Sequence, residues 1–304
     1  MNDKYLTILL YHGVTANKQS GVANFSGKHI NTKIFEDQIS FIKKNCNILS
    51  MDEIVEIYNS GNDWPSNAVA VTFDDGFQNN YLNAVPILDF YSVPATFYVC
   101  AGMVNTDLMF WVDIIEDCIN RTKVKILKNS INGLTTFKLN SENDKINAIN
   151  EIKKYCKFSS SEKKNLIIQE LIHETSIEPS VEASSDYKMM TWDELKVLNN
   201  NSLFTIGGHT LYHDIMTSLK IDKIKANTDA TIALINFNLN QKTIHYSYPE
   251  GQKNHYNEDI ISMLIEKGIV CSPSAIDGVN FNENLFNLKR IMPSFMNREF
   301  PFKL

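Results

Sequence analysis

Long hydrophobic runs are absent from this 304-residue sequence, and so are basic blocks, low-complexity segments and internal repeats. The apolar stretch nearest the N-terminus, residues 5–11, is far shorter than the roughly 20 apolar residues of a membrane-spanning helix. No small-residue cleavage site follows it, as a signal peptide would require. We therefore expect a buried strand at residues 5–11, no membrane span, and a cytoplasmic protein.

Cysteine is scarce, and no cysteine pair has metal-binding spacing. The number of cysteines is odd, and no two of them form a Cys-x-x-Cys pair. The five are Cys46, Cys100, Cys118, Cys156 and Cys271. This pattern argues against a disulfide framework and against a structural zinc site built from thiolates. Free thiols agree with the reducing conditions of the cytoplasm.

An excess of positive charge is also lacking. Lysine and arginine total 29 against 35 aspartates and glutamates, which gives a net charge of −6. Because nucleic acids and anionic membranes attract basic proteins, neither is expected as the main partner. With 43% hydrophobic and 21% charged residues, the composition is that of a soluble globular protein.

Short apolar runs alternate with helical patterns along most of the chain. The runs that predict buried strands are residues 6–11, 68–73, 94–100, 203–208, 243–249 and 268–275. Helices are predicted between them at residues 35–44, 51–58, 81–90, 191–199, 219–237 and 258–267. This alternation predicts parallel strands covered by helices, in an α/β layered or barrel fold.

One region interrupts the alternation. Residues 103–188 contain helical and polar segments, with helices expected at 146–155 and 166–172, and few strand signals. We interpret this region as a mainly helical insertion, carried by a single domain that spans residues 1–304.

Two adjacent carboxylates follow the predicted strand 68–73. Asp74 and Asp75 stand at its C-terminal end, where functional groups gather in parallel α/β barrels, and Gly76 permits a sharp turn. Two carboxylates that close repel each other unless a cation or a proton lies between them. A solvated turn capped by aspartate is the alternative for this tripeptide considered alone.

Two histidines follow another predicted strand, residues 203–208. His209 and His213 are four residues apart, a spacing that places side chains on the same face of a helical turn. Two imidazoles and one carboxylate suit Zn²⁺ or a similar divalent metal and leave positions open for water. An isolated pair with this spacing is commonly incidental, but together with two aspartates at another strand end it indicates a metal site.

These residues resemble the signature motifs of a known family. TFDDG at 72–76 and HTLYH at 209–213 are similar to the first two motifs of the polysaccharide deacetylase superfamily, the NodB-homology carbohydrate esterases. Further segments fall where such proteins have similar sequence, so the resemblance covers most of the chain: LLYHGV, NILSMDEIVEI, VPATFYV, MMTWDEL, SYPEG and NLKRI. The resemblance implies a distorted (β/α)7 barrel.

The resemblance also implies roles for these residues. By the family pattern, Asp75, His209 and His213 bind a divalent metal, and Asp74 acts as the general base. Zn²⁺ is the expected ion, with Co²⁺, Ni²⁺, Fe²⁺ and Mn²⁺ as alternatives. One carboxylate would thus hold the cation that makes the second carboxylate tolerable beside it.

A general acid is needed as well, because the departing amine must be protonated. Most family members take it from a Leu-x-His motif late in the chain, but this sequence has no histidine after His255. Leu10-Tyr11-His12 on the first predicted strand is itself Leu-x-His and resembles the circularly shifted arrangement of the poly-β-1,6-N-acetylglucosamine deacetylases. We therefore expect His12 to be the acid, the alternative being a buried histidine bonded to backbone.

The third motif departs from the commonest family form, Arg-Pro-Pro-aromatic-Gly. The segment SYPEG replaces it, with Tyr248, Pro249 and Glu250 as the expected oxyanion and substrate contacts. The family analogue of Glu250 donates its backbone N–H to the oxyanion. We expect Arg290 to supply the missing guanidinium, hold the Asp74 carboxylate and keep its pKa low; a surface or packing arginine is the alternative.

A tryptophan and several histidines are further candidates for the site. Trp111 forms a Trp-x-Asp pair with Asp113, as in similar deacetylases, and is a candidate platform for a sugar ring; a tryptophan at a helix start that packs on the barrel is the alternative. His255 is expected on a loop near the site. The histidines without a partner motif are expected to be structural or exposed: His29, His173 and His245.

The expected function is that of a metal-dependent hydrolase of C–N bonds other than peptide bonds. It would remove acetyl from an N-acetylated amino sugar of a bacterial glycan or glycan precursor and release acetate. An amidohydrolase of small non-sugar amides and a non-catalytic glycan-binding pseudoenzyme are the alternatives.

Overall fold

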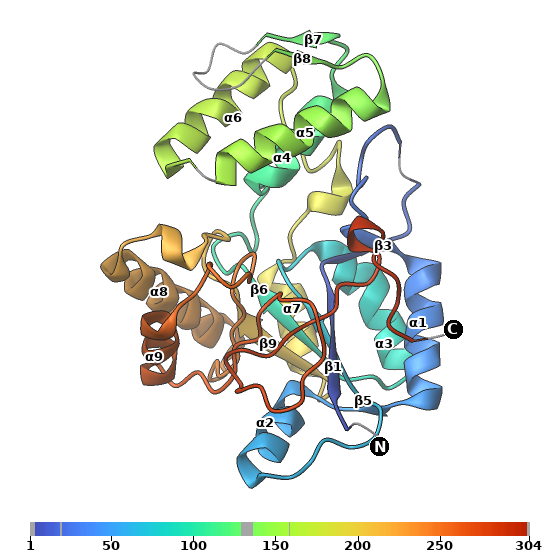
Figure 1. The fold of residues 1–304 in the computed structure, drawn as a ribbon, viewed down its shortest axis with the longest axis vertical. Coiled ribbons are helices and arrows are strands. Elements are labelled where there is room, and N and C mark those ends of the chain that lie inside the picture. Colours follow the sequence, from blue (N-terminus) through green and yellow to red (C-terminus); the bar gives the residue numbers. More distant parts are fainter. Residues whose placement is uncertain (1–3, 19, 129–135, 158, 303–304) are drawn as a thin grey trace. The chain divides into compact units, whose positions relative to one another are not determined.

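The computed structural model of the chain describes residues 4–18, 20–128, 136–157 and 159–302. The chain forms two compact units (Figure 1). Each unit has hydrophobic core residues of its own. The first unit comprises Met1–Ala16, Gly27–Thr106 and Met189–Leu304, and the second comprises Asn17–Ser26 and Asp107–Lys188.

A parallel sheet forms the centre of the first unit. Its strands are, in sheet order, β1 (Leu6–Tyr11), β5 (Ala68–Phe73), β6 (Ala95–Val99) and β9 (Phe204–Gly208), and β4 (Asn47–Ile48) pairs with the start of β5. Every residue of β1 and β5 is buried, as is typical of parallel strands with both sheet faces covered. The register pairs Tyr11 with Phe73, so these two strands end at the same level. The predicted α/β fold with a parallel sheet is thereby confirmed.

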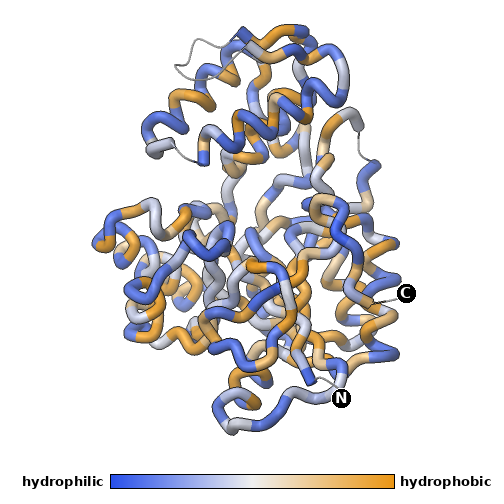
Figure 2. Tube along the Cα trace, viewed as in Figure 1, coloured by the Kyte–Doolittle hydropathy of each residue, from blue (hydrophilic) through white to orange (hydrophobic). Residues whose placement is uncertain are grey.

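Helices connect the strands of the first unit. They are α1 (Thr32–Asn45), α2 (Met51–Ser60), the π-helical turn η1 (Asn80–Ala84), α3 (Val85–Phe90), α7 (Trp192–Asn199), η3 (Met216–Ser218), α8 (Ile221–Leu239), α9 (Glu258–Glu266) and η4 (Phe295–Asn297). A short parallel pair, β2 (Gly13–Thr15) and β3 (His29–Asn31), lies between β1 and α1 in the chain. Hydrophobic and hydrophilic residues alternate along the helices (Figure 2), as expected when one face of each helix is buried.

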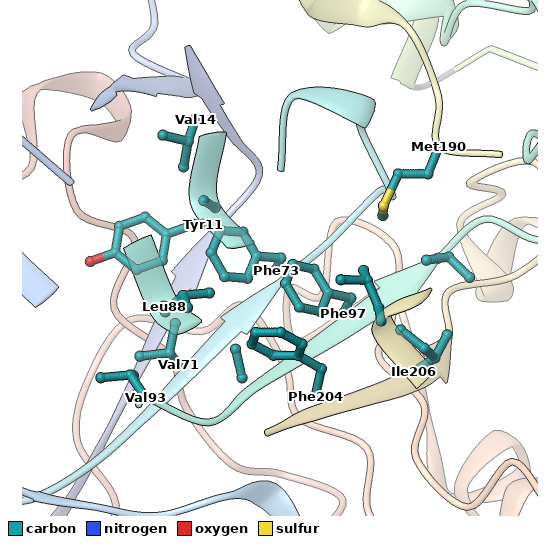
Figure 3. Packing of buried hydrophobic residues seen from close by; sticks show 14 of the residues in the cluster. Tyr11, Val14, Val71, Phe73, Leu88, Val93, Phe97, Met190, Phe204 and Ile206 are labelled. Carbon is teal, nitrogen blue, oxygen red and sulfur yellow. The ribbon is translucent and has the colours of Figure 1, made fainter. Parts of the chain in front are cut away.

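Aromatic side chains from the adjacent strands fill the core of this unit (Figure 3). Phe73 stacks on Phe97 with ring centroids 4.8 Å apart, and Phe97 meets Phe204 edge-on at 5.8 Å. Tyr11 packs against Phe73, and its hydroxyl donates a 2.7 Å hydrogen bond to Gln38 of α1. These contacts fix the strand ends relative to one another, and the residues singled out from the sequence follow those ends.

Beyond β9, the chain continues around the sheet through single bridges. Three parallel bridges join these segments: Gly208 with Tyr246, His245 with Cys271, and Ile291 with Leu9 of β1. The strands of the described residues do not form a closed sheet.

The predicted strands at 243–249 and 268–275 are reduced to isolated bridges. Each segment contains a proline, Pro249 or Pro273, which lacks the N–H that a continuous ladder requires. The N–H of Ser272 donates to the carbonyl oxygen of Leu285 at 3.0 Å, in a segment without strand structure.

The second unit is mainly helical. It contains α4 (Trp111–Arg121), α5 (Glu142–Lys157), α6 (Ser161–Thr175), the turn η2 (Ser185–Tyr187), and the antiparallel pair β7 (Ile126–Leu127) and β8 (Phe137–Lys138). Residues 17–26 belong to this unit, because Val22 is buried in its core and donates its N–H to Asn120 Oδ1 at 2.8 Å. No sequence pattern linked residues 17–26 to the helical region. That the two units make up one deacetylase domain with an insertion stays a prediction.

Across the residues that the structure describes, each helix is too short or too polar to cross a membrane.

Candidate active site

The carboxyl ends of three parallel strands carry four of the residues singled out from the sequence. Asp74 and Asp75 follow β5, His209 follows β9 and His12 follows β1. Groups at the carboxyl ends of parallel strands lie on the same edge of a sheet, where α/β proteins place their sites. The topology therefore brings together residues that are far apart in the sequence.

Asp75, His209 and His213 form a compact cluster of potential metal ligands. One ligand atom from each lies within 4.8 Å of the others, and Asp75 Oδ1 is 3.4 Å from His213 Nε2 and 3.7 Å from His209 Nε2. Asp75 Oδ1 is buried and has no hydrogen-bond partner among the described residues. A buried oxygen beside two imidazole nitrogens fits a divalent cation, which would satisfy all three atoms.

Left-handed backbone conformations shape the two ligand segments. The φ angles are 76° at Asp75, 63° at Thr210 and 61° at His213, and 91° at Gly76. For residues other than glycine, such conformations cost about 1–3 kcal/mol each and cluster at functional sites. The turn after β5 thus allows two adjacent aspartates, which would point in opposite directions on a straight strand, to serve one site.

Asp74 is held by a buried, bidentate ion pair with Arg290. Arg290 Nη1 and Nη2 donate to Asp74 Oδ1 and Oδ2 at 2.8 and 2.7 Å, and both side chains are almost fully buried. Arg290 Nε donates to the Ser274 carbonyl oxygen at 2.6 Å, which fixes the guanidinium plane. Burial raises the pKa of Asp74, but the charges of Arg290 and His209 and the hydrogen bonds from Arg290 outweigh it, so this pKa lies below its usual value. The Arg290 guanidinium thus contacts the Asp74 carboxylate, and the part of this pair in catalysis stays a prediction.

His12 lies at the end of β1, near the two aspartates. Its backbone carbonyl accepts a 2.7 Å hydrogen bond from Asn80 Nδ2, and its ring centroid is 6.1 Å from that of Phe295. Burial lowers the pKa of His12, and the charges of Asp75 and Asp74 oppose this change only in part. Once protonated, the imidazole is therefore a stronger acid than a histidine in water.

Ser247 is a site residue to which no motif assigns a role. Its Oγ lies 2.6 Å from His209 Nδ1 and 3.2 Å from Asp74 Oδ1, and its carbonyl oxygen lies 3.0 Å from the same Nδ1. Burial lowers the pKa of His209 to about 4, so this ring is neutral at pH 7 and keeps one lone pair. The signal that could have identified Ser247 is its place in the third motif, where the common family form has arginine.

Lys28 is a second residue that no motif indicates. Its Nζ is 3.5 Å from Asp75 Oδ2 and 4.5 Å from the ring centroid of Phe77. Burial raises the pKa of Asp75, but the charges of Lys28 and His213 lower it well below its usual value. Lysine is common at protein surfaces, so nothing in the sequence distinguishes this one.

The third motif places one side chain in the hydrophobic core and gives another residue a left-handed backbone. Tyr248 is buried in a hydrophobic cluster, where its ring stacks on Tyr256 with centroids 4.0 Å apart and its hydroxyl donates to the Phe286 carbonyl oxygen at 3.2 Å. Pro249 is buried, and Glu250 has a left-handed φ of 59°. The ring of Tyr248 therefore lies in the core and not among the site residues, while the oxyanion contact of Glu250 stays a prediction.

Trp111, the candidate sugar platform, is the first residue of α4 in the second unit. Its ring is partly buried against the core of that unit, and Lys164 Nζ lies 5.5 Å from its centroid. Asp113 is buried. Trp111 thus packs at a helix start, but against the core of the second unit, where the alternative expected the barrel. Contact of Trp111 with a substrate stays a prediction.

The remaining histidines lie in varied surroundings. His29 is buried, and His245 is buried with its Nε2 2.8 Å from Asp52 Oδ1. His173 is exposed on α6, and His255 accepts a backbone N–H through Nδ1 at 3.2 Å.

Fold and site together define a class of protein. It is a parallel α/β protein that gathers an Asp/His/His cluster and a second, arginine-paired aspartate at its strand ends. The chain belongs to the polysaccharide deacetylase family, because the family model described as polysaccharide deacetylase matches residues 61–271.

Two curated relatives match a smaller part of the chain. The poly-β-1,6-N-acetyl-D-glucosamine N-deacetylase of Escherichia coli (strain K12) is 28% identical over 93 residues, which are 30% of this chain and 14% of that protein. The protein of the same name from Staphylococcus aureus (strain MSSA476) is 32% identical over 83 residues, 27% of this chain and 28% of that protein. The match thus spans less than a third of either relative.

Solved structures share the fold over nearly the whole chain. IcaB from Ammonifex degensii has a TM-score of 0.62 at 16% identity, with 95% of this chain and 92% of that chain covered. The Streptococcus pyogenes deacetylase PplD, solved in complex with acetate, has a TM-score of 0.60 at 17% identity with the same coverage. At these identities the likeness concerns the fold.

Proposed function

We propose that this protein is a metal-dependent N-deacetylase that hydrolyses the acetamido group of an amino sugar in a bacterial glycan or glycan precursor. The observation that carries the proposal is the cluster of Asp75, His209 and His213 beside the Arg290-paired Asp74. The names of the two curated relatives support a polymer of N-acetylglucosamine as the substrate class.

Asp75 Oδ1, His209 Nε2 and His213 Nε2 would hold the metal ion, and Zn²⁺ suits a set of two imidazoles and one carboxylate. When bound, a divalent ion supplies Lewis-acid chemistry, lowering the pKa of a water from about 16 to about 7 and polarising a carbonyl. The chain orients the ligands through their other atoms, because Lys28 lies against Asp75 Oδ2 and Ser247 against His209 Nδ1.

The neighbouring residues would carry the proton transfers. Asp74 takes a proton from the attacking water as the water oxygen bonds to the amide carbon, and Arg290 keeps this carboxylate ionised and in place. The backbone N–H of Glu250 donates to the oxyanion of the tetrahedral intermediate. His12 gives a proton to the amine nitrogen as the C–N bond breaks, so acetate and a free amino sugar leave.

The first unit would form a distorted (β/α)7 barrel, with the second unit as its insertion. The bridges from β9 through Tyr246 and Cys271, and from Ile291 to β1, support this closure. In a closed barrel the first strand is adjacent to the last, which would place His12 and Arg290 at the same site.

Asp74→Asn tests the proposed base. We expect acetate release from N-acetylglucosamine oligomers to fall about 10²–10⁴-fold, the usual contribution of a general base, with bound metal unchanged. Acetate is measured enzymatically and metal by elemental analysis. Asp63→Asn, which removes an exposed carboxylate paired with Lys4, is the matched control and should leave the rate unchanged.

Full acetate release by Asp74→Asn with metal bound would refute the hydrolytic proposal. Metal binding without any hydrolysis by the wild-type protein would support a glycan-binding pseudoenzyme. Turnover of small non-sugar amides, with none of the oligomers, would support a small-amide hydrolase.

A further inference from the structure

One serine lies between the proposed metal ligand His209 and the proposed base Asp74. Ser247 has no exposed surface, and its Oγ lies within hydrogen-bond distance of both His209 Nδ1 (2.6 Å) and Asp74 Oδ1 (3.2 Å). Its backbone N–H donates to the Gly208 carbonyl oxygen at 2.9 Å, at the end of β9. The serine is therefore held rigidly between a proposed metal ligand and the proposed base.

The contacts of His209 Nδ1 determine which ring nitrogen carries the hydrogen. The carbonyl oxygen of Ser247, 3.0 Å away, can only accept a hydrogen bond, so Nδ1 is the N–H nitrogen. In the neutral ring the lone pair then belongs to Nε2, the atom that lies 3.7 Å from Asp75 Oδ1. The backbone of Ser247 thus presents the nitrogen that can ligate a cation.

The direction of the next hydrogen bond follows from this tautomer. The one hydrogen on Nδ1 is shared between the Ser247 carbonyl oxygen and Ser247 Oγ. Oγ therefore accepts, and its own proton is left for the other neighbour, Asp74 Oδ1. The hydrogen bonds therefore run one way, from His209 through Ser247 to Asp74. Asp74 Oδ1 also accepts from Arg290 Nη1 at 2.8 Å, so a hydroxyl and a guanidinium fix the same oxygen.

We propose that Ser247 is a positioning residue that couples the His209 imidazole to the Asp74 carboxylate through this one-way chain. The inference rests on the proposed function for the roles of His209 and Asp74. The common form of the third motif has arginine at the position of Ser247. The serine hydroxyl accepts a hydrogen bond from His209 Nδ1–H, whereas a guanidinium has no acceptor atom. The guanidinium of Arg290 reaches Asp74 from another segment instead.

Ser247→Ala removes the hydroxyl and leaves the carbonyl. The Zn²⁺ affinity, measured by competition with a chromophoric chelator, is expected to fall about tenfold, the lower end of the 10–100-fold range for such outer contacts. In the acetate assay, kcat should fall while KM stays unchanged, because the hydroxyl touches the proposed base. The matched control is Ser272→Ala, an equally buried serine whose side chain interacts with Tyr248; it should change neither quantity.

The tautomer is measured without any enzymatic reaction. Long-range ¹H–¹⁵N spectra of metal-free protein with labelled histidine should show His209 protonated at Nδ1. Ser247→Ala should keep that tautomer, because the carbonyl still accepts. A wild-type His209 protonated at Nε2 would overturn the one-way chain.

Unchanged Zn²⁺ affinity and unchanged kcat in Ser247→Ala would also overturn the proposal. If Ser247→Ala does not fold, Ser247→Cys takes its place, because cysteine is close in size but hydrogen-bonds weakly. Its Zn²⁺ affinity and kcat should fall by less than in Ser247→Ala. Wild-type values of both quantities would refute the coupling. A different result would refute the proposed function alone. In that case the wild-type protein shows the Nδ1–H tautomer and Ser247→Ala loses Zn²⁺ affinity, but the wild-type protein releases no acetate from any sugar. The link between Ser247 and His209 would then still stand.

Discussion

Charged side chains are costly to bury, and this cost shapes the site at the scale of single residues. Arg290 and Asp74 are almost fully removed from water and satisfy one another through two hydrogen bonds. Loss of either partner leaves the other as an uncompensated buried charge. Each residue of the pair therefore requires the other.

Arg290→Met is expected to lower the free energy of unfolding by about 3–5 kcal/mol, because Asp74 loses its buried partner. Urea unfolding at neutral pH measures the change. The control is Arg298→Met, whose ion pair with Asp277 is exposed, with 49% and 61% of the two side chains accessible. It should cost less than about 1 kcal/mol, and equal losses in the two variants would contradict this account of the buried pair.

At the scale of elements, the turn after β5 positions both aspartates. Backbone hydrogen bonds attach it to its surroundings: the Asp74 N–H donates to the Tyr11 carbonyl oxygen at 2.9 Å, and the Gly76 carbonyl oxygen accepts from the Met190 N–H at 2.9 Å. Gly76 has a φ of 91°, and an added Cβ would lie 3.2 Å from Val99. The turn thus depends on a residue without a side chain.

Gly76→Ala should lower the free energy of unfolding by about 2 kcal/mol and weaken Zn²⁺ binding, because the strained turn carries Asp75. Thermal unfolding and chelator competition measure the two effects. The control is Gly61→Ala at the end of α2, where φ is 68° and an added Cβ meets nothing within 4 Å. It should cost about 1 kcal/mol with unchanged Zn²⁺ affinity; a similar loss of affinity in both variants would disprove a local role for the turn.

At the scale of the whole molecule, a buried histidine makes the stability of the metal-free protein depend on pH. Burial lowers the pKa of His209 to about 4, from about 6.5 in an unfolded chain. Below about pH 6.5 the unfolded state binds a proton at His209 more readily than the folded state does. The contribution of His209 to the free energy of unfolding is therefore complete above that pH and is lost towards about pH 4. The free energy of unfolding should fall by on the order of 3 kcal/mol across this window.

Chemical unfolding of chelator-treated protein at several pH values between about 7 and about 4.5 measures this decline. His209→Gln should reduce the slope of the curve and leave the part that His12 contributes, because burial lowers the pKa of His12 as well. His173→Gln, which replaces an exposed histidine of α6, should leave the slope unchanged. Wild-type stability that stays constant through the window would refute the assignment.

The long strands of the central sheet were predictable, because β1, β5, β6 and β9 are compact apolar runs. The segments 243–249 and 268–275 look alike in sequence but pair only at single bridges. Pairing depends on neighbours supplied by distant parts of the chain, which a local pattern does not contain. The association of residues 17–26 with the second unit was unpredictable for the same reason.

Within the candidate site, the motifs predicted that Asp75, His209 and His213 lie together, and the structure places one ligand atom of each within 4.8 Å of the others. Such a group can be found from sequence because residues that share one ion recur at fixed spacings. Metal binding by the three residues stays a prediction. The third motif marks the position of Ser247, but the contacts of Lys28 and Ser247 could not be predicted, because they depend on packing between distant segments. Composition and periodicity do not predict individual contacts of this kind.

The bridge between Ile291 and β1 also bears on biosynthesis. On the ribosome, the nascent chain makes Asp74 long before its counter-charge, since Arg290 comes 216 residues later. Until then the emerging sheet must leave that carboxylate in water or bury it alone, and burial alone is costly. This edge of the sheet can therefore close around Asp74 only after residue 290 has left the exit tunnel.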